Sequence, residues 1–92
     1  MIESAAYEII KKEGFEEGLK QGLQQGLQQG LLEEAREMVL EALEERFGIV
    51  PSSIITKIRG LREREHLKVL HRAAIRAKSL EEFVEVLKQV ET

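Results

Sequence analysis

Glycine recurs at every fourth position between residues 14 and 30, and this ladder constrains the fold more than any other feature of the sequence. A large apolar residue follows each glycine, and the spacers are Glu, Lys or Gln. A period of four is close to the helical period of 3.6 and far from the strand period of 2. The ladder therefore predicts a long helix. Its glycines are Gly14, Gly18, Gly22, Gly26 and Gly30, and the apolar residues that follow them are Phe15, Leu19, Leu23, Leu27 and Leu31.

The ladder glycines weaken such a helix unless a partner offsets their cost. Each glycine in a helix interior costs about 1 kcal/mol relative to alanine, so five cost about 4–5 kcal/mol. The usual compensation is close approach of a second helix along the groove that glycines leave open. Because the period exceeds 3.6, the stripe winds in the right-handed sense, and a partner is expected to cross it right-handedly. A neutral duplication of the GLQQ unit is the alternative, but it accounts less well for the differing spacers after Gly14 and Gly18.

The ladder is thus predicted to be the interface of a homo-oligomer, either a dimer or a tetramer. The predicted interface residues are Gly14, Gly18, Gly22, Gly26, Gly30, Leu19, Leu23, Leu27 and Leu31. The small size of the chain, 92 residues, favours the same conclusion, because a core of this size is marginal and gains burial from association.

Cysteine is absent, which excludes a disulfide framework, a thiolate nucleophile and a cysteine metal site. No stretch approaches 18 consecutive apolar residues, and no continuous apolar core follows Met1, so neither a membrane span nor a signal peptide is predicted. All 17 acidic residues are Glu. Because Asp and Asn, which mark turns, are both missing, few turns are expected. These features predict a cytoplasmic, all-α protein with no membrane contact and no cofactor.

The sequence predicts two parts, a long oligomerisation helix in residues 1–47 and a small bundle of three short helices in residues 48–92, which pack on the end of the first helix. The long helix should run from about Ser4 to Arg46. Gly48 is expected to end it as a left-handed C-cap.

Three residues that typically begin or end helices divide the second part into its short helices. Pro51 suits the first turn of a helix that ends at Gly60. The next helix is expected over residues 62–78. Ser79 begins the last one, where Ser79 and Glu82 have the spacing of a capping box.

Apolar residues at helical spacing predict the core of the bundle. In the long helix the predicted seam consists of Leu31, Ala35, Met38 and Ala42, broadened by Leu32, Val39 and Leu43. In the short helices the predicted core residues are Ile54, Ile55, Ile58, Leu67, Leu70, Ala74, Ile75, Ala77, Leu80, Phe83, Val84, Leu87 and Val90.

Taken together, the repeated EG-x-x-G units, the segment ERFGIVPSSIITKIRGL and the ending AKSLEEFVEVL resemble the C-terminal tail of the recombination-promoting nuclease family, bacterial proteins that are also called YhgA-like transposases. Arg46, Phe47, Gly48, Pro51 and the run from Ser79 to Phe83 look like the helical module that ends many members of this family. The resemblance covers nearly the whole chain, although glycine tetrads are low in complexity.

The resemblance implies a parent protein whose activity resides in a PD-(D/E)xK nuclease domain. That chemistry needs a metal-binding Asp and an E-x-K motif, whereas this chain has no Asp and no Glu two positions before any lysine. We therefore expect no catalytic residues and no metal site here, and the chain to be a tail, an excised piece or an independent small protein. The resemblance implies a non-catalytic oligomerisation or regulatory module, which binds itself and the full-length nuclease in trans.

A basic stripe supplies the alternative function, a small DNA- or RNA-binding helical module. Arg64, Lys68, Arg72 and Arg76 recur every four residues and are candidate phosphate contacts. Tyr, Phe and Trp, which would stack on bases, are absent from this region. We favour a solvated face that pairs with Glu of the first or last helix, because a basic stripe alone is weak evidence for nucleic-acid binding.

A single E-x-x-H motif, Glu63 to His66, has the spacing found in di-iron helical bundles. Only one copy exists, and arginines flank it, so a solvated helix start is the preferred interpretation. His71 lies five residues from His66, which is not the spacing of a helical ligand pair. Metal binding is therefore the weakest of the functional hypotheses.

Overall fold

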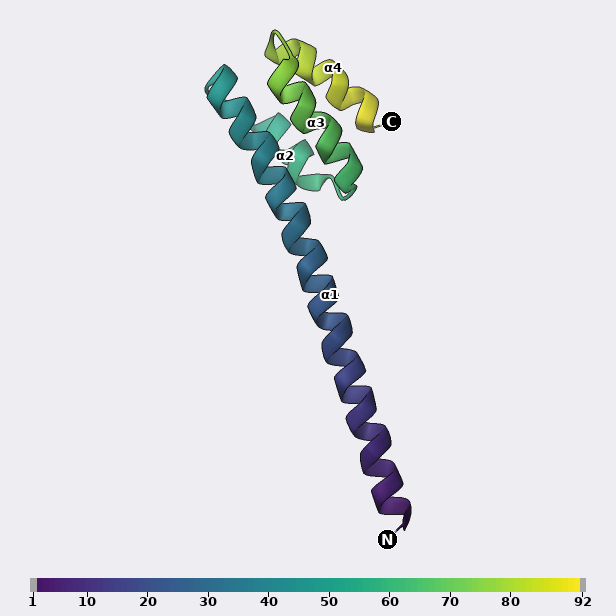
Figure 1. The fold of residues 1–92 in the computed structure, drawn as a ribbon. Helices are drawn as coiled ribbons and strands as arrows, with labels where there is room; N and C mark the ends of the chain where they lie inside the picture. Colours follow the sequence, from purple (N-terminus) through teal and green to yellow (C-terminus); the bar gives the residue numbers. More distant parts are fainter. Residues whose placement is uncertain (1, 92) are drawn as a thin grey trace. The chain divides into compact units, whose positions relative to one another are not determined.

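The computed structural model describes the backbone of residues 2–91 and the side chains of residues 12–91. This described part is all-helical, with four helices and no strand, and confirms the predicted all-α class. No helix within it combines the length and the apolar character that crossing a membrane requires. The helices are α1 (Ile2–Phe47), α2 (Ser52–Gly60), α3 (Arg64–Arg76) and α4 (Leu80–Glu91) (Figure 1).

The chain divides into two compact units, of which the first ends at Gly30 and the second begins at Leu31. This division falls inside α1, earlier than the expected boundary between residues 47 and 48. The reason is that the C-terminal part of α1 belongs to the core of the second unit, where Val39 and Leu43 are completely buried. In the second unit, α2, α3 and α4 gather around this part of α1 (Figure 1).

One hydrophobic core fills the second unit and draws on all four helices. Phe83 of α4 is its largest fully buried side chain. The helices α3 and α4 pack against each other, and α1 and α2 complete the core. The buried residues are Val39, Leu40, Leu43, Val50, Ile54, Ile58, Leu67, Leu70, Ala74, Ala77, Phe83 and Leu87.

The buried face of α1 differs from the predicted seam. Met38, expected at its centre, is 45% exposed, and Leu31 is 39% exposed, whereas Val39 and Leu43 are completely buried. The seam through Ala35 and Met38 offers small or unbranched side chains, while the neighbouring face offers Leu and Val. Burying the bulkier face removes more apolar area from water, and this decides which face of α1 packs into the core.

The helix α3 is shorter than the predicted span of residues 62–78. Glu63 and Ala77, at its two ends, have non-helical backbone angles, which confine the helix to Arg64–Arg76. Its core face runs through Leu67, Leu70 and Ala74, and Ile75 on the neighbouring face is 53% exposed. The prediction that Ile75 lies in the core was therefore wrong.

Two predicted helix caps are present. Gly48 follows α1 with a φ of 78°, and its N–H donates to the carbonyl of Glu44 at 3.0 Å, as expected of a left-handed C-cap. Before α4, the hydroxyl of Ser79 accepts the N–H of Glu82 at 3.2 Å. The return bond of the predicted capping box is displaced by one residue, because the Glu82 carboxylate accepts the N–H of Lys78 at 3.0 Å.

Two arginines of α1 connect it to the other helices of the second unit. Arg36 donates from Nε and Nη2 to the carbonyl of Leu61, at 3.0 and 2.6 Å, and so reaches the residue after α2. Arg46 donates from Nη1 to the carbonyls of Ala74 and Ala77, at 2.9 and 2.5 Å, and so satisfies the end of α3. The Arg46 guanidinium also lies over the ring of Phe47, 4.9 Å from its centre.

We expect Arg46→Met to lower the free energy of unfolding by about 1–3 kcal/mol, because it leaves two partly buried carbonyls without their side-chain donor. The matched control is Arg59→Met, which removes an exposed ion pair to Glu37 at 3.2 Å and should change stability by about 0–1 kcal/mol. Urea denaturation followed by circular dichroism measures both. Equal losses in the two variants would show that the Arg46 hydrogen bonds contribute nothing beyond a surface charge.

Candidate functional site

The apolar residues of the glycine ladder are exposed along α1. The exposed fraction is 67% for Phe15, 54% for Leu19, 75% for Leu23 and 65% for Leu27. Residues four apart lie on the same side of a helix, so these side chains form one apolar stripe beside the glycines. Leu31, the last predicted interface residue, belongs to the second unit and is less exposed.

The five glycines of the ladder have free space around them within the described part of the chain. A methyl group added at any of them would meet no atom within 4 Å outside its own stretch of helix. Nothing in the described residues therefore uses the close approach that glycine permits. The glycines and the apolar stripe together leave an uncovered surface on the first unit.

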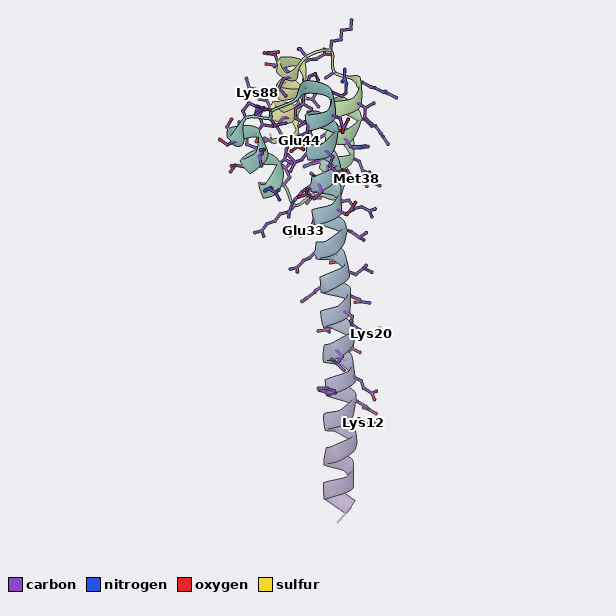
Figure 2. The ribbon with its side chains drawn as sticks, turned by 90° about the vertical axis from the view of Figure 1, so that its left-hand side faces the viewer. Lys12, Lys20, Glu33, Met38, Glu44 and Lys88 are labelled. Carbon is purple, nitrogen blue, oxygen red and sulfur yellow. The ribbon has the colours of Figure 1, made fainter. Side chains whose placement is uncertain are left out.

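A second candidate site is a groove of about 320 Å³ between α1 and α3, within the second unit. Met38 lies on α1 at this groove (Figure 2). The helix α3 contributes both apolar and basic side chains, with buried Leu67 at the back. The complete lining is Ala35, Met38, Arg64, Leu67, Lys68, His71 and Arg72.

Three of the four residues of the predicted basic stripe thus line one groove, while Arg76 lies outside its lining. Among the side chains that the structure describes, no residue of this stripe pairs with Glu of the first or last helix, although that pairing was expected. Lys68 pairs with Glu65 of its own helix at 3.4 Å, and among residues 12–91 neither Arg64 nor Arg72 has an ion pair. The wall of the groove formed by α3 therefore carries positive charge at Arg64 and Arg72 that residues 12–91 do not neutralise.

An acidic row borders the groove on its other side. The row consists of three glutamates on α1. Glu34 stands four residues before Met38, and Glu41 and Glu45 stand three and seven residues after it. Helical geometry therefore places all three along the same side of α1 as Met38. All three are exposed, and within the described residues none has an ion pair. The groove consequently has an apolar floor between a basic wall and an acidic border.

The two ends of the E-x-x-H motif lie at and just before the start of α3. Glu63 precedes α3 in an extended conformation, and His66 lies in the first turn of that helix. In residues 12–91, no three His, Cys, Asp or Glu side chains are grouped so that they could hold a metal ion.

A further cavity, of about 340 Å³, lies between α2 and α4. Its rim includes Glu85 and Lys88, which pair with each other at 3.7 Å. With Glu85 and Lys88 paired, Glu81 is the remaining charged residue of the lining, so this cavity offers less to a charged partner than the groove between α1 and α3.

Sequence reasoning missed the groove and the two arginine anchors, Arg36 and Arg46. Both arginines stand three residues from a buried position of α1, Val39 and Leu43 respectively, and this spacing is the signal that could have found them. The groove has no comparable signal, because it depends on which face of α1 the bundle buries.

Comparison with protein-family models, with curated proteins and with solved structures found no match to this chain. The relation to recombination-promoting nucleases accordingly stays a resemblance, based on the glycine tetrads and the motifs of the bundle.

Proposed function

We propose that this chain is a non-catalytic helical module that self-associates through the glycine ladder. The uncovered surface of the ladder supports this proposal. Leu19, Leu23 and Leu27 are 54–75% exposed, although they recur in register in a stretch whose other positions are glycine or polar. Its glycines weaken the helix by about 1 kcal/mol each, and the described chain gains no contact in return. A second copy packed along the stripe would bury the leucines and use the space beside the glycines.

By the resemblance, the module belongs at the C-terminus of a PD-(D/E)xK-type recombination-promoting nuclease. Self-association there would bring catalytic domains together. A homotypic surface is self-complementary, so a free copy of the module would compete for the ladder of a full-length nuclease and regulate it in trans. The partners proposed are thus the chain itself and the full-length nuclease of the same family.

The test is the solution mass of the chain, measured by light scattering. We expect the unchanged chain to have a mass at least twice the 10.5 kDa of a single copy. Introducing Leu23→Glu and Leu27→Glu should lower this mass, because charge replaces the apolar stripe through which the ladder associates. The control is Gln24→Glu with Gln28→Glu. It adds the same two charges at the residues that directly follow Leu23 and Leu27, and it should keep the mass of the unchanged chain. An unchanged chain that is monomeric at high concentration would refute the proposal.

The second candidate function is a nucleic-acid-binding module. It is favoured by one observation, the absence of ion-pair partners for Arg64 and Arg72 within the described residues. The acidic row beside the groove opposes it, because Glu34, Glu41 and Glu45 would repel a phosphate backbone laid along α3. Its signature would be an affinity for DNA that falls steeply as salt is raised.

A further inference from the structure

We infer that the groove between α1 and α3 is a second contact surface, at which a second copy of this chain docks through its own groove. This inference goes beyond the proposed function, which requires only the ladder. It concerns residues of the second unit alone, and it assigns a role to side chains that neither the core nor the ladder uses.

The apolar surface of the groove extends past its lining residues. Met38 is 45% exposed at the groove, and buried Leu67 forms its back. Leu31 stands one helical turn before Ala35 and is 39% exposed, while Ile75 stands one turn after His71 and is 53% exposed. Contiguous exposed apolar side chains with a charged border are typical of protein contact sites.

The charges on the two sides of the groove identify a second copy as the occupant. In a contact with two-fold symmetry, every pairing occurs twice. If residue i of the first copy contacts residue j of the second, then residue j of the first copy contacts residue i of the second. The acidic row on α1 of one copy would then face the basic wall on α3 of the other, and the same pairing would occur twice. The acidic row consists of Glu34, Glu41 and Glu45, and the basic wall of Arg64, Lys68 and Arg72.

Other occupants satisfy only one side of the groove. An acidic peptide or a nucleic acid would neutralise the basic wall and leave the acidic row facing negative charge, which disfavours the complex. A basic peptide would meet the opposite difficulty at Arg64 and Arg72. A second copy brings both signs of charge in the required arrangement, together with its own apolar strip of Leu31, Met38 and Ile75.

The test uses the full chain with Leu23→Glu and Leu27→Glu, so that only contacts outside the ladder remain. Analytical ultracentrifugation at several concentrations measures the mass. We expect this chain to dimerise as its concentration rises. Adding Arg64→Glu and Arg72→Glu, which makes both sides of the groove acidic, should return it to a monomer, and so should adding Glu41→Arg and Glu45→Arg, which makes both sides basic.

Mixing the two charge-reversed chains provides the decisive measurement. In the mixture, each acidic side meets a basic side on the other chain, so we expect the dimer to reappear with one copy of each chain. Circular dichroism of each variant alone verifies that it is folded. A mixture that stays monomeric, or a dimer that survives the reversal of either row alone, would overturn the inference.

A further variant tests the apolar floor of the groove instead of its two charged sides. Met38→Glu places a carboxylate on the apolar floor at a residue that the monomer leaves 45% exposed, so the fold should tolerate it while the groove contact is lost. Retention of the dimer in this variant would contradict docking through the groove. So would binding of a fluorescently labelled DNA duplex that dissociates the dimer, because the groove would then belong to nucleic acid.

The outcomes for the ladder and the groove are separable. If the leucine substitutions leave the mass unchanged while the groove variants lower it, the ladder proposal fails and the groove inference stands. If the leucine substitutions alone give a monomer at every concentration, the groove inference fails and the ladder proposal stands.

Discussion

Replacing Gly22 and Gly26, first with alanine and then with leucine, is expected to strengthen the helix and to weaken the assembly. Both residues are better helix formers than glycine, by roughly 0.8–1 kcal/mol per position, and the space beside each glycine is open in the single chain. In the assembly the added side chain occupies the space into which the partner packs, and leucine fills more of it than alanine. Helicity by circular dichroism should therefore rise while the solution mass falls.

The control for this series is Gln21→Leu with Gln25→Leu. These positions precede the same two glycines and lie on the side of the helix away from the apolar stripe, so their substitution should leave the mass unchanged. If the mass of the Gly→Leu chain is also unchanged, close approach is not what the glycines provide, and neutral duplication of the tetrad becomes the better explanation of the ladder.

Truncating Phe83 to alanine is expected to remove most of the stability of the second unit. Phe83 is completely buried among residues from all four helices, and a Phe→Ala change in a core typically costs about 3–5 kcal/mol. A unit of about 60 residues has a stability of roughly 3–9 kcal/mol in all. Urea denaturation should show a transition at much lower denaturant, or no cooperative transition.

The comparison for Phe83 is Val69→Ala, on the exposed side of α3. Val69 is 44% exposed, so this change should alter the free energy of unfolding by about 0.5 kcal/mol or less. Similar urea midpoints for the two variants would show that the core does not depend on Phe83 in the way that its burial indicates.

Local signals in the sequence placed most helix boundaries correctly. Gly48 adopts the left-handed conformation that ends α1, and Ser79 caps α4, because each acts through residues within one turn of itself. Pro51 directly precedes α2, close to the predicted first turn. The all-α class followed from helical periodicity and from the shortage of turn-forming residues.

The features that sequence reasoning missed depend on contacts between distant parts of the chain. Both faces of α1 near Met38 and Val39 have apolar residues at helical spacing, and only the packing of the other helices decides which is buried. The anchors Arg36 and Arg46 bond to carbonyls 25 to 31 residues away, beyond the reach of any local pattern. The spacing of the basic residues predicted a stripe that includes Arg72. The groove beside this stripe could not be predicted, because it depends on the orientation of α1.

The position of Arg46 also bears on the electrostatics of helix ends. The helices α1 and α3 finish near each other in the second unit, since Arg46 in the last turn of α1 reaches the carbonyls of Ala74 and Ala77 (Figure 1). The C-terminus of a helix carries a partial negative charge of about half an elementary charge, so two neighbouring C-termini repel each other. The guanidinium lies beside both and lowers the energy of both macrodipoles at once. Arg46 therefore offsets the repulsion between the two helix ends in addition to hydrogen-bonding the carbonyls of α3.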